Sequence, residues 1–222
     1  GISGDALIFA GGANFPDAPP WDGGTKTWYD SIFVLTKPDG QWKKLEQKLP
    51  SPLAYGASVT HENRLICIGG DDGMKPSKQV LAIEWQDGRV AIEELPSLPR
   101  PCTGLCAEII DEKVYVAGGL DRLEKDSERA LKTFWMLDLN DPSAGWQDLE
   151  PWPGPERFQA VPVVMEDQFY MLSGIASPTS VAFRTPRKNS STATTKMRPA
   201  MMLFSRSATS VSTCSDWSPV ST

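Results

Sequence analysis

The chain has 222 residues, of which 40% are hydrophobic, and a formal net charge of −6. This length allows one large domain or two small ones, the apolar content is sufficient for a buried core, and no apolar run approaches the roughly 18 residues of a membrane-spanning helix. The acidic balance argues against nucleic acid as a partner, and a single histidine argues against a histidine-based zinc site or a Ser-His-Asp triad.

An apolar strand that ends in two glycines recurs along the chain. In order, the segments are ALIFAGG (6–12), RLICIGG (64–70) and KVYVAGG (113–119), followed by QFYMLSG (168–174), in which serine replaces the first glycine. The intervals between these pairs are 58, 49 and 55 residues. A period of about 50 residues with this ending is typical of kelch repeats, each of which forms a four-stranded blade of a β-propeller.

Two further strands are predicted after each glycine pair. Trp42 and Trp146 recur at matching positions in the last of them and are expected to pack between blades. Short polar turns join the remaining strands, and one of these turns contains His61, which is expected to be exposed. Residues 5–174 are therefore predicted to be all-β, with about thirteen antiparallel strands in roughly three to three and a half propeller blades. The predicted third strands are WYDSIFVL (28–35), KQVLAIEW (78–85) and TFWMLDL (133–139), and the fourth strands are QWKKLE (41–46), RVAIEEL (89–95) and GWQDLE (145–150).

The long connections of this pattern belong to one rim of the predicted propeller. In an antiparallel blade, the loops between second and third strands lie on the same side as the loops between successive blades. Binding residues usually gather in such loops on a rigid scaffold. The loop GGANFPDAPPWDGG (11–24), stiffened by proline and glycine, is predicted to be one of these rim loops. A structural plug is the alternative interpretation of this loop.

Four residues of this rim are candidates for binding a substrate: Asn14, Tyr55, Asp71 and Arg157. Asn14 and Asp71 follow glycine pairs and are expected at the matching rim position, whereas Tyr55 and Arg157 stand where a loop enters an innermost strand. Arg157 is favoured, because a guanidinium can hold a sugar carboxylate with two parallel hydrogen bonds. For each residue, the alternative is a cap or a hydrogen bond between blades.

Residues 175–222 differ in composition from residues 1–174. They contain no glycine, 19 serine and threonine residues and one acid, Asp216, whereas all 18 glycines precede them. Low complexity of this kind is typical of disorder. The switch falls inside a predicted blade. We therefore interpret residues 1–174 as a partial kelch propeller and residues 175–222 as a disordered or frameshifted tail whose basic character has no function.

The run LIFAGGANFPDAPPWDGG, with AYGAS and LICIGGDDG after it, resembles the sialic acid mutarotases, also called N-acetylneuraminate epimerases. The resemblance covers residues 5–174, is strongest over residues 5–73, and implies part of a six-bladed kelch ring. In the usual member these elements lie near the C-terminus, whereas here the segments KVYVAGG and GPERFQA, which resemble N-terminal blades, follow them. This order is similar to that of the cyclically permuted mutarotase family, and the chain is then interpreted as truncated.

The resemblance implies an isomerase that interconverts the anomers of a sialic acid. A base takes the proton of the anomeric hydroxyl, the ring opens, and an acid protonates the ring oxygen. In the family, a Glu and an Arg of an NGE…R element carry these roles, and this chain lacks that element. Its catalytic residues therefore stay unassigned, and negligible activity is expected of the chain by itself.

Two classes of function remain after this comparison. The first is a carbohydrate mutarotase or epimerase with a small sugar acid as ligand. The second is a non-catalytic kelch module that binds carbohydrate or protein, because one fold hosts many functions. Neither a cofactor nor a metal is expected, and neither nucleic acid nor a membrane is expected as a partner. An incomplete ring is expected to associate through its exposed blade faces. The resemblance implies a periplasmic or secreted location, and the chain shows no signal peptide.

Overall fold

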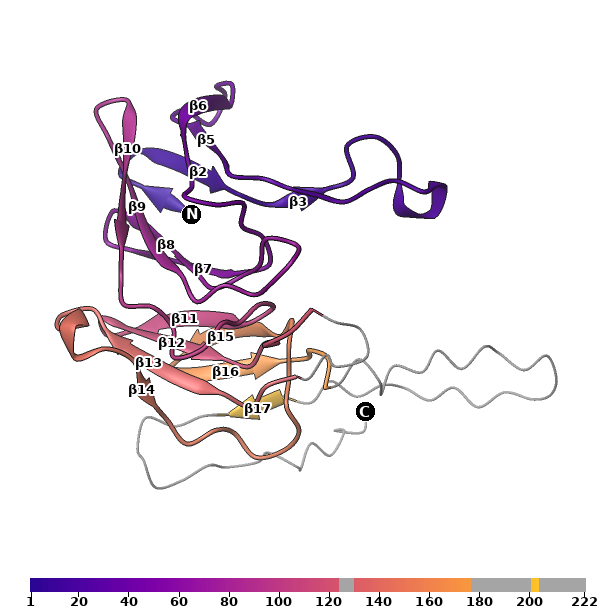
Figure 1. The fold of residues 1–222 in the computed structure, drawn as a ribbon. Coiled ribbons are helices and arrows are strands. Elements are labelled where there is room, and N and C mark those ends of the chain that lie inside the picture. Colours follow the sequence, from indigo (N-terminus) through magenta and orange to yellow (C-terminus); the bar gives the residue numbers. More distant parts are fainter. Residues whose placement is uncertain (124–129, 177–200, 204–222) are drawn as a thin grey trace, which may run out of the picture.

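The computed structural model describes residues 1–123, 130–176 and 201–203, and this part of the chain is all-β (Figure 1). Two short 3₁₀ segments, η1 (Pro20–Asp22) and η2 (Pro142–Ala144), are its only helical turns. Within the described ranges, no helix has the length and apolar character needed to span a membrane. The strands are β1 (Ile2–Ser3), β2 (Ala6–Ala10), β3 (Ala13–Asn14), β4 (Thr27–Trp28), β5 (Ser31–Leu35), β6 (Lys43–Lys48), β7 (Ala57–His61), β8 (Arg64–Ile68), β9 (Val80–Gln86), β10 (Arg89–Glu94), β11 (Cys106–Ile110), β12 (Lys113–Ala117), β13 (Phe134–Asp138), β14 (Gln147–Asp148), β15 (Val161–Met165), β16 (Gln168–Leu172) and β17 (Met201–Leu203).

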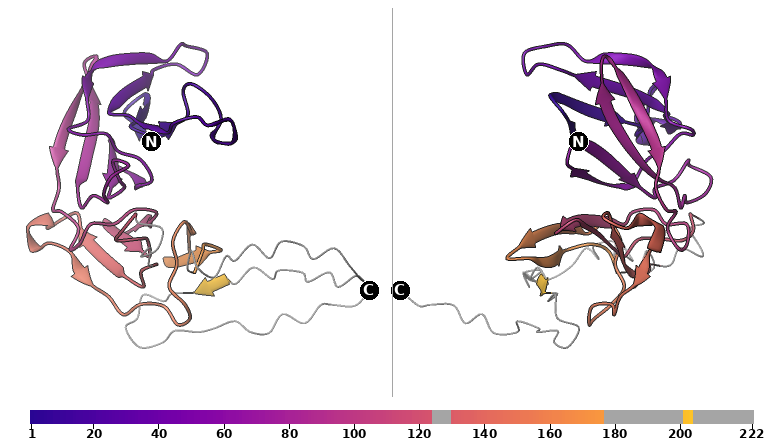
Figure 2. Two further views of the ribbon diagram at one scale, coloured as in Figure 1. Left: turned by 45° about the vertical axis from the view of Figure 1, so that its right-hand side comes forward. Right: turned by 90° about the vertical axis from the view of Figure 1, so that its left-hand side faces the viewer.

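The strands form four antiparallel sheets, here called the first to fourth sheets, and a two-stranded ribbon of β3 and β4. The sheet orders are β1-β2-β5-β6, β7-β8-β9-β10, β11-β12-β13-β14 and β15-β16-β17. Each sheet is a meander in chain order, which is how a propeller blade is built. Figures 1 and 2 show the sheets following one another from the first at one end to the fourth at the other. The all-β, kelch-type propeller class is confirmed, and the six-bladed ring stays a prediction.

The glycine pairs mark the places where the next sheet comes close. The first glycine of a pair has a positive φ and lies against a carbonyl oxygen of the following loop. A Cβ on Gly11 would lie 2.2 Å from the Leu53 oxygen, and a Cβ on Gly118 would lie 2.2 Å from the Arg157 oxygen. No side chain fits at these distances, so glycine is required. The second glycine donates its N–H to the same carbonyl, as Gly119 does to Arg157 at 2.8 Å.

The core consists of apolar layers between successive sheets. Alternation along β8 directs Leu65 and Cys67 into the layer shared with the first sheet, and Ile66 and Ile68 into the layer shared with the third. A third layer joins the third and fourth sheets and contains Trp152, which is fully buried. The inner sheets therefore bury both faces, as the blades of a propeller do.

The outer faces of the first and fourth sheets have no neighbouring sheet among the described residues. Leu7 and Phe9 on β2 are 41% and 55% exposed, and Val161 and Met165 on β15 are 56% and 52% exposed. Side chains of this kind normally pack against a neighbouring blade. The two end sheets therefore present apolar surface to solvent.

The two tryptophans that directly precede the fourth strands, Trp42 and Trp146, have different surroundings. Trp146 packs against the core between the second and third sheets, and its indole N–H donates to the Pro96 carbonyl oxygen at 2.7 Å. Trp42 is 48% exposed. The prediction that it packs between blades is wrong in this structure, because no described sheet precedes the first one.

The C-terminal tail is described only in part. Met201–Leu203 forms β17, which pairs antiparallel with β16 in the place of a third strand. The remainder of the tail, residues 177–200 and 204–222, lies outside the described residues. The interpretation of residues 175–222 as a disordered or frameshifted tail stays a prediction.

Candidate functional site

One rim of the sheets gathers the loops that follow the glycine pairs and the loops that join successive sheets. We call this the glycine rim. Backbone hydrogen bonds connect the two kinds of loop at every junction, for example from Ala54 to Asp71 at 2.9 Å and from Thr103 to Leu120 at 2.9 Å. The predicted gathering of the long loops is therefore confirmed, and the short turns such as that at His61 lie at the other ends of the strands. In the described part of the chain, the glycine rim comprises residues 11–30, 49–56, 69–79, 95–105, 118–123, 130–133 and 149–160.

The inner edge of the glycine rim is a chain of backbone hydrogen bonds. Tyr55, Gly104 and Gln159 occupy the same place in three successive joining loops and have φ values of 57°, 62° and 52°. The Gly104 N–H donates to the Tyr55 oxygen at 2.8 Å, and the Gln159 N–H donates to the Gly104 oxygen at 2.7 Å. The left-handed conformation costs a non-glycine residue about 1 kcal/mol or more. The surrounding hydrogen bonds hold the Tyr55 backbone in this conformation, so the position from which its side chain projects on the rim is fixed.

Asp71 is a buried carboxylate with three hydrogen-bond donors, and its exposed fraction is 3%. The Trp28 indole N–H and the Gly73 N–H donate to Oδ1 at 2.9 and 3.0 Å. The Thr103 hydroxyl donates to Oδ2 at 2.6 Å. These donors come from different sheets or their loops, so Asp71 fixes three rim segments relative to one another. The carboxylate therefore forms hydrogen bonds within the protein, which is the alternative to substrate binding given for this residue in the sequence analysis.

Asn14 and Asp71 do not occupy matching positions, contrary to the sequence-based expectation. Asn14 follows its glycine pair by two residues and Asp71 by one. Asp71 forms an isolated β-bridge with Pro76, just as Ala13 pairs with Trp28 in the β3–β4 ribbon. Asp71 therefore corresponds to Ala13 and not to Asn14. Asn14 is exposed, and its side-chain oxygen accepts a hydrogen bond from the Tyr29 hydroxyl at 2.8 Å. This pair places two polar groups at the surface of the ribbon.

Lys26 is a rim residue that the sequence analysis did not single out. Its ammonium nitrogen lies 4.4 Å from the centre of the Tyr55 ring, 5.3 Å from that of Trp28 and 5.7 Å from that of Phe15. Aromatic faces attract a cation. Among the described residues, no carboxylate forms an ion pair with this ammonium. Its N–H donors therefore stay available to an anionic ligand, with three aromatic rings beside it.

Arg157 lies at a junction between the third and fourth sheets. Its guanidinium donates to the Gly174 oxygen at 3.3 Å, and its own carbonyl accepts from Gly119. In the preceding loops the same place is held by Leu53 and Cys102, which are buried. The observed contact is a hydrogen bond within the fold. A role for Arg157 in holding a sugar carboxylate stays a prediction.

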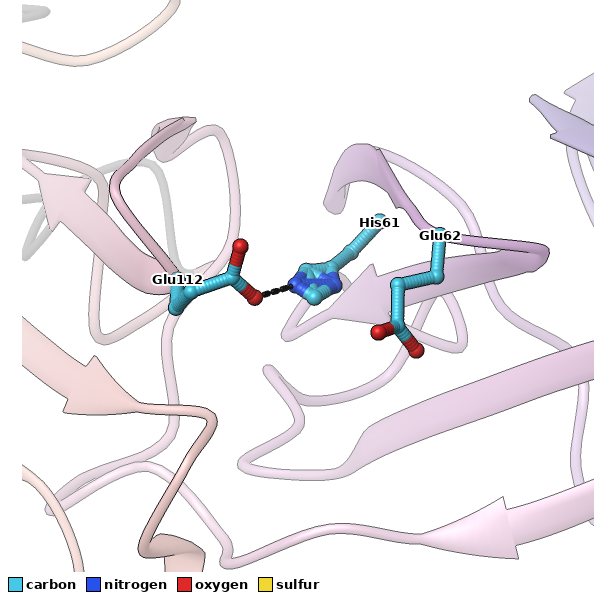
Figure 3. Close-up of side chains that lie close together, drawn as sticks. All are labelled: His61, Glu62 and Glu112. Atoms are coloured by element: carbon cyan, nitrogen blue, oxygen red, sulfur yellow. Dashed lines mark hydrogen bonds and ion pairs between the residues drawn. The ribbon is translucent and has the colours of Figure 1, made fainter.

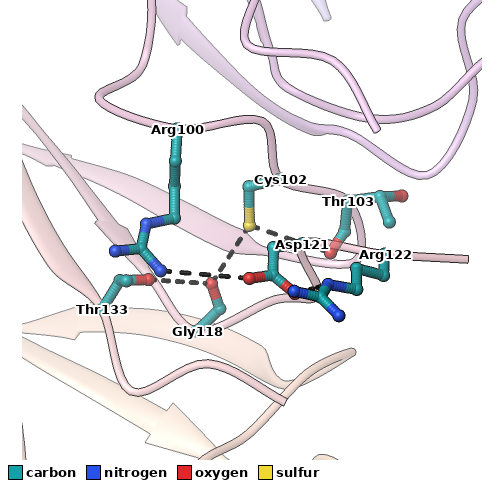
Figure 4. Close-up of polar contacts among 7 residues, drawn as sticks. All are labelled: Arg100, Cys102, Thr103, Gly118, Asp121, Arg122 and Thr133. Carbon is teal, nitrogen blue, oxygen red and sulfur yellow. Dashed lines mark hydrogen bonds and ion pairs between the residues drawn. The ribbon is translucent and has the colours of Figure 1, made fainter. Parts of the chain in front are cut away.

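A second group of charges lies beside the third sheet (Figure 4). Arg100 and Arg122 each approach the carboxylate of Asp121 at 4.0 Å. The group carries two positive charges and one negative charge.

The family comparisons agree with this architecture. Residues 1–92 match the family model of N-acetylneuraminate epimerase, and residues 101–141 match the kelch motif. The chain is a kelch protein that is similar to the N-acetylneuraminate epimerases over residues 1–92. The matched region contains three of the four predicted rim residues, Asn14, Tyr55 and Asp71, and also Lys26.

Individual relatives of this kelch protein cover only part of it. The N-acetylneuraminate epimerase of Yersinia pestis (strain Pestoides F) is 36% identical over 105 residues, which cover 42% of this chain and 26% of the relative. That of Brucella suis (strain ATCC 23445 / NCTC 10510) is 35% identical over 103 residues, again 26% of its length. The alignment with these curated relatives thus spans about a quarter of their length.

A solved structure, titled "Structure of YjhT", superposes with a TM-score of 0.63 at 13% sequence identity. The superposition covers 78% of this kelch protein and 57% of the YjhT chain. At this identity, the likeness concerns the fold alone.

Proposed function

We propose that the glycine rim binds a sialic acid, in a protein that interconverts the anomers of this sugar. The observation that carries the proposal is the match of residues 1–92 to the N-acetylneuraminate epimerase family. This region supplies the β3–β4 ribbon, the Tyr55 loop and the Asp71 loop, which are the parts of the rim with free polar and aromatic groups.

Lys26 is the group that we propose for the sugar carboxylate. Its ammonium has no acidic partner in the described part of the chain, and the rings of Phe15, Trp28 and Tyr55 surround it. A sugar acid combines a carboxylate with a ring that has apolar C–H faces. An ammonium beside aromatic faces matches both features, because small-ligand sites combine apolar surface with a few fixed polar groups. The Asn14–Tyr29 pair would offer hydrogen bonds to hydroxyl groups.

Asp71 is proposed as a positioning residue and not as the catalytic base. A general base must reach the proton that it abstracts and must accept it. The two carboxylate oxygens of Asp71 already accept from Trp28, Gly73 and Thr103, and the side chain is buried. Its contribution is to hold the ribbon strand that carries Trp28 against the neighbouring sheet. The acid and base of the reaction are not assigned to residues of this chain.

Ligand-observed NMR tests the binding proposal directly. N-acetylneuraminate is compared with its methyl ester, which differs by the loss of the carboxylate charge. We expect saturation transfer to the free acid and a much weaker signal for the ester. Lys26→Met keeps the length and apolar stem of the side chain and is expected to weaken binding of the acid by about tenfold or more, because a charge-assisted hydrogen bond is lost.

Lys44→Met is the matched control for this experiment. Lys44 also lies beside an aromatic ring, with its ammonium 6.0 Å from the centre of Phe33, but it belongs to β6 and not to the glycine rim. Equal binding by the two variants, or equal binding of acid and ester, would contradict the proposed role of Lys26. Absence of any sialic acid binding by the folded wild-type chain would contradict the rim as a sugar site and favour a kelch module with a protein partner.

A further inference from the structure

The rim opposite the glycine rim contains a group of three side chains of the types that bind metal ions (Figure 3). His61 is the last residue of β7, Glu62 belongs to the turn between β7 and β8, and Glu112 belongs to the turn between β11 and β12. These turns come from the second and third sheets. The group therefore lies at a junction between two blades, away from the sugar site proposed above.

His61 is buried, contrary to the expectation that this polar turn leaves it exposed. Only 8% of the residue is exposed, because the neighbouring turn of the third sheet covers it. Its Nε2 contacts the Glu112 carboxylate. Its Nδ1 is also buried and has no hydrogen-bond partner. A buried nitrogen without a hydrogen-bond partner lowers the stability of the fold and is rare in proteins, so a bound ligand is a physical explanation for it.

The donor atoms of the group are close enough to share one ion. One ligand atom from each of His61, Glu62 and Glu112 lies within 4.8 Å of the others. Figure 3 shows the imidazole lying between the two carboxylates, with Nε2 toward Glu112 and the second nitrogen on the side of Glu62. Glu112 is half-exposed, and Glu62 is exposed, so both carboxylates can adjust to an ion.

The corresponding junction between the first and second sheets has no such group. There, the hydroxyl of Ser3, which stands in the place of His61, donates to the backbone oxygen of Asn63, which stands in the place of Glu112. A neutral hydrogen bond is therefore sufficient to join two blades at this position. The imidazole and carboxylates at the next junction add chemistry that the packing of blades does not require.

We propose that His61, Glu62 and Glu112 bind a divalent transition-metal ion of the zinc class, with water completing the coordination. One nitrogen and two carboxylate ligands suit zinc, whereas calcium and magnesium prefer sites made entirely of oxygen. Two carboxylates and a neutral imidazole also balance the charge of a divalent ion. Because the ligands come from two sheets, the ion links the second and third blades and stabilises their junction by mass action.

The single histidine of the chain makes this proposal directly testable. In protein labelled with ¹⁵N-histidine and freed of any affinity tag, one imidazole gives all the ring signals. All samples carry Cys214→Ser, because a thiol is a strong zinc ligand. We expect one zinc ion per chain, a large shift of one ring-nitrogen resonance on adding zinc, and a higher midpoint of thermal unfolding. An unchanged imidazole spectrum at saturating zinc would overturn the proposal.

Substitutions separate this site from adventitious zinc binding. Glu62→Gln removes an exposed ligand without disturbing the His61–Glu112 contact and is expected to weaken zinc binding by at least about tenfold. Glu166→Gln is the control, because Glu166 occupies the same position in the β15–β16 turn and has a φ of 51°, close to the 50° of Glu62. Equal losses of zinc affinity in the two variants, or no loss in Glu62→Gln, would also overturn the proposed zinc site. The ring-nitrogen shift is measured without sugar, so its outcome is independent of the proposed function.

Discussion

The hydroxyl of Thr103 is one of three donors to the buried carboxylate of Asp71, and its removal is expected to destabilise the fold. Thr103→Val replaces the hydroxyl with a methyl group of similar size, so the substitution leaves no cavity. It removes the 2.6 Å hydrogen bond to Oδ2. Both residues are 3% exposed, and solvent therefore has little access to replace the lost donor.

The expected loss follows from the charge of the acceptor. A hydrogen bond to a charged group contributes about 1.5–3 kcal/mol, and one between neutral groups about 0.5–1.5 kcal/mol. Trp28 and Gly73 still donate to the other oxygen of Asp71 in the variant. We therefore expect a decrease of about 2 kcal/mol in the free energy of unfolding, near the middle of the range for charged acceptors. This is a factor of roughly 30 in the ratio of folded to unfolded protein.

Urea unfolding followed by tryptophan fluorescence measures this loss, with an unchanged m-value as the sign that only stability has changed. Thr133→Val is the control, because the Thr133 hydroxyl donates to a neutral acceptor, the Gly118 oxygen, at 3.2 Å. It is expected to cost about 1 kcal/mol. A loss in Thr103→Val no larger than that in Thr133→Val would refute the argument. So would an equal cost of Thr103→Val in an Asp71→Asn background, where the acceptor is neutral.

Three further predictions concern activity, thiols and surface. By NMR, the chain should not speed the anomer equilibration of freshly dissolved sialic acid above the buffer rate; faster equilibration that Arg157→Ala abolishes would place a working site here. Burial raises the pKa of Cys67 to about 11 and those of Cys102 and Cys106 to about 12. Native protein should therefore resist iodoacetamide at these thiols in mass spectrometry. Because the folded state favours the neutral thiol, the free energy of unfolding should be highest below about pH 9, near the pKa of a free thiol, and should fall as the pH rises toward the raised pKa values of these cysteines. A urea midpoint that is the same below about pH 9 as at the higher pH would contradict this. Val163→Lys, on the exposed face of β15, should reduce self-association in sedimentation experiments without lowering stability, and unchanged association would remove that face as a contact surface.

The repeat and the strand order could be predicted from the sequence because their causes are local. A strand alternates its side chains with a period of two, and a short polar turn reverses it. Gly11 and Gly118 mark positions that no other residue can occupy, so the spacing of such pairs reveals the length of a blade. The crowding of long loops on one rim then follows from antiparallel order alone. For the same reason, the sequence alone places Asn14 and Tyr55 on that rim.

Only the tertiary structure decided which side chains meet across the blades. Asp71 contacts Trp28 and Thr103, which are 43 and 32 residues away, and His61 contacts Glu112 at a distance of 51 residues in the chain. No local pattern encodes these pairs, because each partner belongs to a different repeat and the repeats vary most in their loops and turns. Burial depends in the same way on what lies beside a sheet. Trp42 and Trp146 each directly precede the fourth strand of their sheet, yet Trp42 is exposed because only Trp146 has a preceding sheet to pack against.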